Sequence, residues 1–444
     1  MNLRQGKALV VSAALVFALQ TPVVGQGRVQ GGELDSLIAV AVAHHPTLEA
    51  AQARVRAARA RVQPSGSLPD PRAGIGVMNL PVNASGYDDM TMNTLIVGQM
   101  VPYPGRLRLQ RELASAEVMA EEAARFGLKG DIERDVRFSY YDIVYAGHAL
   151  RVLAHSQQVT IGLTQNAESR YATGAIPQRD ILRLQAEAGR IAEEAAMVSE
   201  ERRAAIARLS ALLGGAAAVH LTGDIPETIK AAAVAGDPGR IRFVSADLGA
   251  RVADSPLRSV PLLQQAALSA NPELRLDDAR IAAQLIRVRL AEQAHLPDFD
   301  VELQYGQRPS RSDMVSLMVS VPLPVRRASR QEQELAAARA DLAALLSERA
   351  ARVLELHADI AEVYSELEAL RAQLALYVRS IIPQGRAAFE SAASGYATGR
   401  AEFATLLESR SAIFEYEFAY ERGLATFAKK LAELERLVGS EVLS

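Results

Sequence analysis

The side chains best suited to chemistry are few and scattered along the chain. His44 and His45 are adjacent, and adjacent residues of a helix point to different sides, so the pair does not predict a shared metal ion. The segment "GIGVMN" from Gly74 has two of the three glycines of a dinucleotide loop, and it follows a proline turn rather than a strand. The sequence contains no Walker loop, no zincin motif and no Gly-x-Ser-x-Gly. These patterns predict no enzyme, no cofactor and no metal site.

Thioethers are the remaining groups with ligand chemistry, because methionine sulfur is soft and suits Cu(I). Six of the nine methionines fall in or near two short segments: Met78, Met90, Met92, Met100, Met314 and Met318. Methionine is also an ordinary filler of loops and cores. Packing is the expected role of these residues, and transport of a soft metal is the alternative.

The composition limits the class of protein. The 444 residues are 49% hydrophobic and 23% charged, which predicts a globular chain with a large core. A formal net charge of −3 offers no basic surface for nucleic acid. The absence of cysteine excludes disulfides, thiolate metal sites and an acylated N-terminal cysteine.

The N-terminus predicts export from the cytoplasm. Arg4 and Lys7 precede the apolar run 8–19, and small residues follow up to Gly25. We expect residues 1–25 to be a removable signal peptide, with an uncleaved anchor as the alternative. No later stretch has the roughly 20 apolar residues of a membrane-spanning helix.

The order of short motifs predicts an internal duplication. "YATG" ends at Gly174 and again at Gly399, 225 residues later. Four more pairs recur in the same order at offsets between 220 and 228 residues: "HPTL" from His45 and "NPEL" from Asn271, "LPDP" from Leu68 and "LPDF" from Leu296, "VPYPGR" from Val101 and "VPLPVR" from Val321, and "ALLG" ending at Gly214 and "RLVG" ending at Gly439. We therefore expect two copies of one unit, residues 33–214 and 258–439, joined by a connector at 215–257.

Each unit begins with the same two parts. A helical stretch, about residues 33–62 and 258–294, ends at Leu-Pro-Asp, because proline disfavours helix in the residue before it. A β-hairpin follows, at residues 72–101 and 298–322.

A long helix completes each unit. It begins after Pro-x-Pro, near residues 104–170 and 326–394, and is rich in Ala, Leu, Glu, Arg and Gln. At 1.5 Å per residue it would be about 100 Å long. The turns at 171–174 and 396–399 end it at a glycine, and a second helix runs back. Such helices need coiled-coil partners.

The second hairpin alternates strictly between apolar and other residues. Its apolar positions are Phe299, Val301, Leu303, Tyr305, Val315, Leu317, Val319 and Val321, and the positions between them are Asp300, Glu302, Gln304, Met314, Ser316, Met318 and Ser320. Alternation suits a half-buried strand of a soluble protein, and it equally suits a membrane barrel with lipid outside and a polar lumen inside. The first hairpin alternates less cleanly.

The full set of motifs resembles the TolC-like family of bacterial outer membrane efflux proteins. The resemblance lies in the two Leu-Pro-Asp signals, "QMVPYPGRLRLQ", "SVPLPVRRASRQ", the YATG tips and the leucine-glycine ends, and it covers residues 33–439. "QMVPYPGR" is similar to the heavy-metal efflux branch. The family fold is mainly α with a small β part: three subunits form a 12-stranded outer membrane β-barrel continued by a periplasmic α-helical barrel.

The resemblance implies a passive exit duct of a tripartite efflux or secretion system, not an enzyme. Its partners would be two further copies of the chain, a periplasmic adaptor, an inner membrane pump of RND type and outer membrane lipid. The residues implied to face the barrel lumen are Asp300, Glu302, Gln304, Ser316 and Met318. Those implied to contact the adaptor at the periplasmic tips are Tyr171, Gly174, Ala175, Gly399 and Arg400.

The resemblance also implies a periplasmic aperture. Relatives narrow it with two aspartates after the second tip, where this chain has Thr405 and Glu408, so one acidic ring remains. Three Glu408 side chains around an axis would attract cations. The alternative is that Glu408 is an ordinary solvated helix residue.

A closed-state link in relatives joins a tyrosine and an arginine of the second tip to an aspartate of the first. Tyr396 and Asp180 match two of these positions. The arginine position is Ala401, with Arg400 beside it. The expected link is therefore the Tyr396 to Asp180 part.

A second hypothesis is a soluble periplasmic coiled-coil adaptor or structural protein. An adaptor would have one helical hairpin and a compact β domain, and it would lack two matched, alternating β-hairpins. The two hairpins favour the channel.

Overall fold

The computed structural model describes residues 32–82, 89–215, 223–235, 257–309, 311–322 and 328–443. The expected signal peptide lies outside these residues, as does much of the connector. The first half contains α1 (Glu33–His44), α2 (Pro46–Ser65), β1 (Arg72–Met78), β2 (Met92–Val101), α3 (Arg106–Ala172) and α4 (Gln178–Leu212). After the short α5 (Glu227–Val234), the second half contains α6 (Val260–Ala270), α7 (Pro272–Glu292), a 3-10 turn (Gln293–His295), β3 (Phe299–Gln307), β4 (Met314–Ser320), α8 (Gln331–Leu376), a π turn (Tyr377–Ile381), α9 (Ile382–Ala397) and α10 (Phe403–Val438).

The helical stretch that opens each half is divided into two helices. The chain breaks before Pro46 and before Pro272, because a residue that precedes proline is pushed out of the helical conformation. Each proline then starts the next helix, where its missing N–H costs nothing. The side chain of Asn271 caps α7 by accepting from the N–H groups of Glu273 and Leu274, at 2.9 and 3.0 Å.

The long helices run as predicted, with one interruption. α3 spans 67 residues without a break. The matching helix of the second half passes through the π turn Tyr377–Ile381 just before Pro383, which cannot donate the next helical hydrogen bond. In the part of the chain that the structure describes, no helix combines the length and the apolar character needed to cross a membrane.

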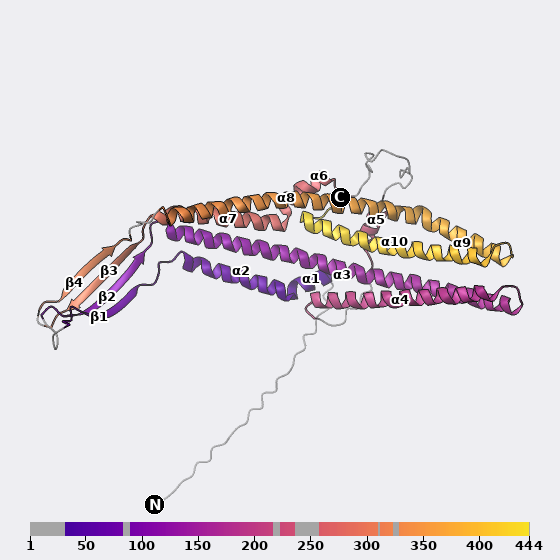
Figure 1. Ribbon diagram of the computed structural model, residues 1–444, viewed down its shortest axis with the longest axis horizontal. Coiled ribbons are helices and arrows are strands. Elements are labelled where there is room, and N and C mark those ends of the chain that lie inside the picture. Colours follow the sequence, from indigo (N-terminus) through magenta and orange to yellow (C-terminus); the bar gives the residue numbers. More distant parts are fainter. Residues whose placement is uncertain are drawn as a thin grey trace, which may run out of the picture.

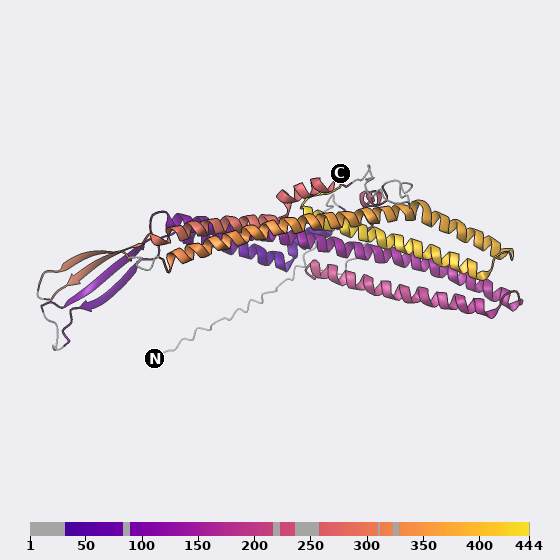
Figure 2. The same ribbon diagram turned by 45° about the horizontal axis from the view of Figure 1, so that its top comes forward.

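The four strands form one antiparallel sheet in the order β1-β2-β3-β4. The central pair joins the two halves, with Leu95 opposite Tyr305 and Val97 opposite Leu303. The sheet lies at one end of an elongated molecule, and the turns after α3 and α9 lie at the other (Figures 1 and 2). β1 and β4 are left as edges.

A charged contact fixes the sheet to the helices. Arg106, the first residue of α3, donates from Nη1 to both carboxylate oxygens of Asp298 at 2.6 Å. Its Nη2 donates to the carbonyls of Gln293 and Leu296 at 2.9 and 2.8 Å. The Leu-Pro-Asp signal of the second copy thus holds the helix start of the first.

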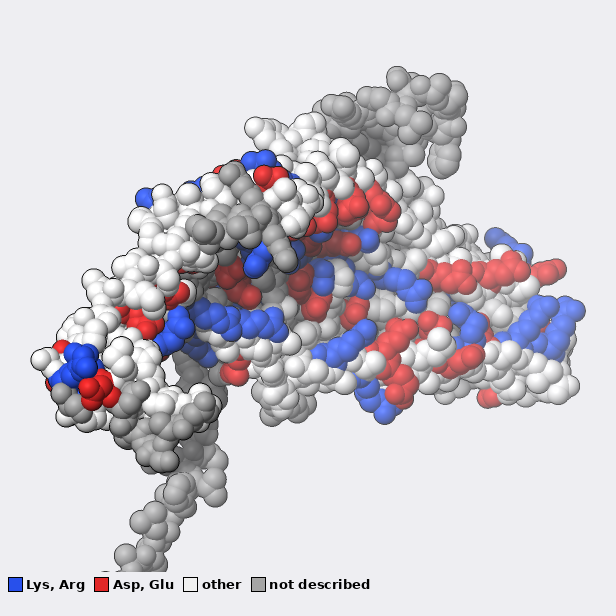
Figure 3. All heavy atoms as spheres, turned by 60° about the vertical axis from the view of Figure 1, so that its left-hand side comes forward, with Lys and Arg blue, Asp and Glu red and all other residues white. Residues whose placement is uncertain are grey.

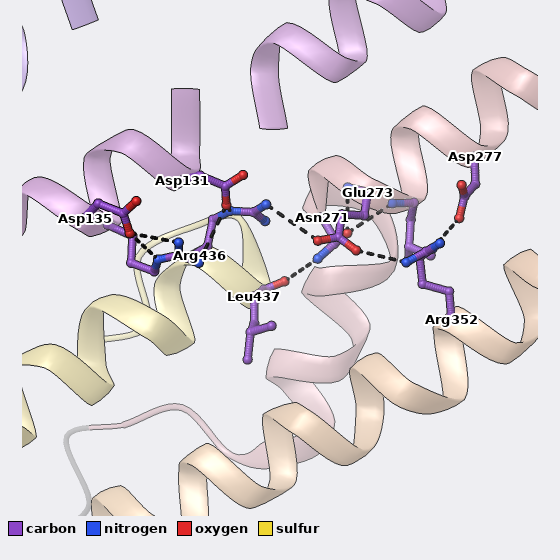
Figure 4. A network of polar contacts seen from close by, with 10 residues as sticks. Asp131, Asp135, Asn271, Glu273, Asp277, Arg352, Arg436 and Leu437 are labelled. Atoms are coloured by element: carbon purple, nitrogen blue, oxygen red, sulfur yellow. Dashed lines mark hydrogen bonds and ion pairs between the residues drawn. The ribbon is translucent and has the colours of Figure 1, made fainter. Parts of the chain in front are cut away.

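A second polar network joins the two halves of the chain (Figure 4). Arg436 of α10 donates from Nε to Asp131 of α3 at 2.7 Å, and its Nη2 lies 3.6 Å from Glu273 of α7. Arg352 of α8 contacts Glu273 at 3.1 Å and Asp277 at 2.7 Å. Four of the long elements are therefore held in register by three acidic and two basic side chains.

Candidate functional site

The first tip is a tight turn that ends α3. The N–H of Gly174 donates to the carbonyl of Tyr171 at 2.8 Å, and the N–H of Ala175 donates to that of Arg170 at 2.9 Å. Gly174 has a φ of 74°, the left-handed region that favours glycine. Tyr171, Gly174 and Ala175 are exposed, so they are accessible to a partner.

The second tip repeats this backbone, as the matched sequence predicts. The N–H of Gly399 donates to the carbonyl of Tyr396 at 3.2 Å, and that of Arg400 donates to Gly395 at 2.8 Å. Gly399 has a φ of 71°. Open space surrounds both tip glycines, so the requirement for glycine is conformational rather than steric.

The two tip tyrosines differ in burial. Tyr171 is 46% exposed, whereas its counterpart Tyr396 is 9% exposed. The guanidinium of Arg170 lies 4.4 Å from the centre of the Tyr396 ring, and Phe403 packs edge-on against the same ring at 5.7 Å. Cation–π and aromatic contacts therefore hold Tyr396 between the two tips.

The expected link between Tyr396 and Asp180 is not formed within the chain. The hydroxyl of Tyr396 is buried and has no hydrogen-bond partner among the described residues, because the ring is held by Arg170 and Phe403. Asp180 is buried in the first turn of α4, where the helix dipole favours an acidic side chain. One of its carboxylate oxygens lies 3.6 Å from Nε of Arg179.

Thr405 and Glu408 share one exposed face of α10. Their spacing of three residues puts them on the same side, and the intervening Leu406 is buried on the other. Glu408 forms no ion pair with any residue in the described ranges. Arg400 is also exposed, at the end of the turn. These side chains are free to face whatever lies beside the tip.

Sequence reasoning missed a buried arginine above the tips. Arg410 is 6% exposed, and its Nε has no hydrogen-bond partner among the described residues. Burial lowers the pKa of its guanidinium, against the raising effect of the charges of Glu417 and Glu187. The signal in the sequence was its position, because Arg410 occupies an apolar helix position between the buried Leu406 and Ile413.

Arg410 opens onto a groove between α3 and the pair α9 and α10. The groove has a volume of about 660 Å³. Eight titratable side chains contribute to its lining: Arg151, His155, Arg386, Glu390, Arg410, Glu417, Tyr420 and Glu421. The groove therefore presents charged side chains of both signs, which suit the binding of a polar partner.

At the other end, the strands put the five residues expected in the lumen on one face of the sheet. Glu302 lies opposite Met318, Gln304 opposite Ser316, and Asp300 opposite Ser320. Glycines occupy this face in the first hairpin: Gly74, Gly76 and Gly98. Because glycine has no side chain, it adds no polar residue at these positions. The alternation of polar and apolar residues is therefore weaker in the first hairpin than in the second.

The opposite face of the sheet is apolar and unusually exposed. Its exposed fractions include 88% for Ile75, 69% for Val315 and 70% for Leu317. Leu95, Val97, Leu303, Tyr305 and Val319 extend the same face. Figure 3 shows charged side chains over the helices. Few lie on the near surface of the sheet, apart from a cluster at the end of the sheet that is farthest from the helices. An apolar patch of this kind marks contact with a partner or with lipid.

Comparisons with known proteins agree with this geometry. The family model described as "Outer membrane efflux protein" matches residues 37–215 and 263–440. The cobalt-zinc-cadmium resistance protein CzcC of Cupriavidus metallidurans is 20% identical over 369 residues, which are 83% of this chain and 77% of that protein.

Solved structures share the fold. The outer-membrane channel OprN has a TM-score of 0.74 at 21% identity, with 92% of this chain and 90% of that chain covered. The outer membrane protein VceC of Vibrio cholerae has a TM-score of 0.72 at 19% identity, with 93% and 97% covered.

Proposed function

The chain belongs to the outer membrane efflux protein family, and we propose that three copies of it enclose one duct, with the sheets in the outer membrane and the helix tips in the periplasm. Proteins of this family are exit ducts of tripartite efflux systems, in which they work with an adaptor and an inner membrane pump. They conduct passively and the pump supplies the energy. The soluble adaptor hypothesis is not favoured, because the family match spans both halves of the chain.

The observation that carries the proposal is the sheet. One of its faces is apolar and exposed, the other is polar, and neither edge strand has an outer partner among the described residues. Four strands are too few to close a barrel, since even the smallest membrane barrels use about eight. Pooling the strands of three subunits pairs every edge, turns the apolar face to lipid and leaves the polar face in the lumen.

The periplasmic end is proposed as the regulated end. The exposed tip residues Tyr171, Gly174, Ala175, Gly399 and Arg400 would meet the adaptor. Glu408 would form the acidic ring of the aperture, with Thr405 one turn nearer the tip. We propose small molecules or metal ions as cargo and an RND-type pump as the inner membrane partner.

Membrane fractionation and imaging test this function. The full-length protein should be recovered in outer membranes and extracted only with detergent. Electron micrographs of the extracted protein should show elongated particles with threefold symmetry, and planar bilayers should show single-channel conductance. Recovery in a soluble periplasmic extract without detergent would overturn the proposal.

A further inference from the structure

Methionines gather on the polar face of the sheet. Met78 lies directly opposite Met92 in the pairing of β1 with β2. Met314 lies opposite Gly306, and Met318 lies opposite Glu302. Since paired residues of a sheet share a face, all four side chains stand on the side of Glu302 and Gln304. The pattern along each single strand did not predict that methionines of three strands would be neighbours on one face of the sheet.

Three of these methionines lie close to Gly306 in the sheet. The sulfur of Met92 lies over this glycine so closely that a Cβ built there would be 2.7 Å from it. Met314 is the strand partner of Gly306. The sulfur of Met78 accepts a hydrogen bond from Nε2 of Gln304 at 3.5 Å, and Gln304 is the preceding residue of β3 on the same face. Methionines from β1, β2 and β4 are thus neighbours around Gly306 on one face of the sheet.

The floor of this cluster is made of small residues. Gly76 lies opposite Thr94, Thr94 lies opposite Gly306, and neither glycine carries a side chain that would separate the methionines. Gly306 is buried, with the Met92 side chain over it. Its backbone does not have a positive φ, so its absent side chain provides space rather than conformational freedom.

The donor set favours one class of ligand. Thioether sulfur is a soft, neutral donor that suits Cu(I) and binds hard divalent cations poorly. Within the described ranges, no group of three or more His, Cys, Asp or Glu residues could hold a metal ion. A thioether also has no proton to lose near neutral pH, so metal binding would not weaken in mild acid as it does at histidine or thiolate sites.

We propose that Met78, Met92 and Met314 form a binding site for a soft monovalent cation, Cu(I) or Ag(I), on the polar face of the sheet. The site itself does not depend on conduction. It rests on the proposed function only for the statement that this face lines the duct, where each subunit would contribute one site.

Titration with Ag(I) tests the site. Full-length detergent-extracted protein in chloride-free buffer is titrated by calorimetry, at pH 7 and at pH 5. We expect one site per chain with equal affinity at both pH values. The variant M78L/M92L/M314L should bind at least about tenfold more weakly. Gly306→Ala, which displaces the Met92 sulfur, should weaken binding without removing a ligand.

The matched control is M119L/M197L, which changes two exposed methionines of α3 and α4. This variant should bind Ag(I) as the unaltered protein does. Unchanged affinity in the triple variant, or an equal loss in the control, would overturn the site. X-ray absorption at the silver edge of the unaltered protein needs no variant: sulfur neighbours support the site, and a shell of oxygen or nitrogen alone contradicts it. A protein that binds Ag(I) but conducts nothing in bilayers would contradict the proposed function and leave the site standing.

Discussion

Arg170 of the first tip holds Tyr396 of the second tip in two ways. Its guanidinium lies 4.4 Å from the centre of the ring, and its Nη1 donates to the Tyr396 carbonyl at 3.2 Å. The position that corresponds to Arg170 in the second copy is Gly395, so no reciprocal contact can form. The two turns therefore have the same backbone conformation, but only the first supplies an arginine that binds the tyrosine of the other.

Removing Arg170 should loosen the contact between the tips. A cation–π contact at a partly exposed site contributes about 0.5–1 kcal/mol, so Arg170→Ala should raise the fraction of time in which the tips are apart. We expect larger or more frequent openings in planar bilayers. Arg183→Ala is the matched control, since Arg183 is exposed near the start of α4 and forms no ion pair with any residue in the described ranges. Identical traces for both variants would contradict this role of Arg170.

Substituting the tip glycines should cost stability through the backbone. Gly174→Ala and Gly399→Ala force alanine into a left-handed conformation, at about 1–2 kcal/mol each. The unfolding temperature should fall by a few degrees in either variant. Gly189→Ala, at an exposed helical position in α4, should leave it equal or raise it. Thermal denaturation followed by circular dichroism measures the unfolding temperatures. An equal loss in Gly189→Ala would show that the effect does not come from the left-handed conformation of the tip glycines.

Neutralising Glu408 should change the ion selectivity of the aperture. If three Glu408 side chains surround the axis, Glu408→Gln should lower the preference for cations and weaken block by divalent cations severalfold. Glu193→Gln is the control, because Glu193 is exposed on α4 away from the tips. Reversal potentials in a salt gradient measure the effect. Unaltered selectivity would leave Glu408 as a solvated helix residue.

Breaking the pair of Arg106 and Asp298 should weaken the junction of sheet and helices. Their side chains are only 17% and 26% exposed, and the lost hydrogen bonds include charged ones, each contributing about 1.5–3 kcal/mol. Asp298→Asn should therefore lower the temperature at which the folded assembly is lost. Asp341→Asn, an exposed change on α8, should have no effect. Equal heat resistance of both variants would show that the pair adds nothing.

Acid should release the connector from the helices. Asp224 accepts from Nζ of Lys230 at 2.7 Å and lies 3.0 Å from Nε2 of His148. Burial acts to raise the pKa of Asp224, but hydrogen bonds from Lys230 and the N–H of Ile225, with the charge of His148, lower it overall. The ordinary pKa of an aspartate in the unfolded chain is about 3.9. Because the pKa of Asp224 is lower in the folded state, its charge stabilises the fold at any pH above this value. The stabilisation is lost as the pH falls through the folded pKa.

The measurement for Asp224 is limited proteolysis within residues 223–235. The unaltered protein should resist cleavage at neutral pH and lose this resistance only below about pH 4. Asp224→Asn should be cleaved faster at pH 7, because it cannot carry the charge. Thr228→Ala, an exposed change in α5, should be cleaved at the original rate. Equal rates for both variants would contradict an anchoring role for Asp224.

Local patterns in the sequence were enough to predict the elements. Alternation in residues 299–307 and 314–320 follows from the period of a strand, and the glycines of "YATG" follow from the left-handed turn that ends a helix. Local rules were also the source of the errors. The break before Pro272 obeys the same proline rule that ends the helical stretch at Leu-Pro-Asp, but it was not predicted, and neither was the π turn before Pro383.

Motif order and local patterns in the sequence predicted a duplication, the order of helices and strands, the two faces of the second hairpin and the family. Tertiary structure decided which side chains meet. The contact of Arg170 with Tyr396, the burial of Arg410 and the placement of Met78, Met92 and Met314 on one face of the sheet depend on residues from different elements. Periodicity fixes the face on which a residue lies because it depends on local backbone geometry. Contact across elements depends on register and packing between distant segments, which no local pattern contains.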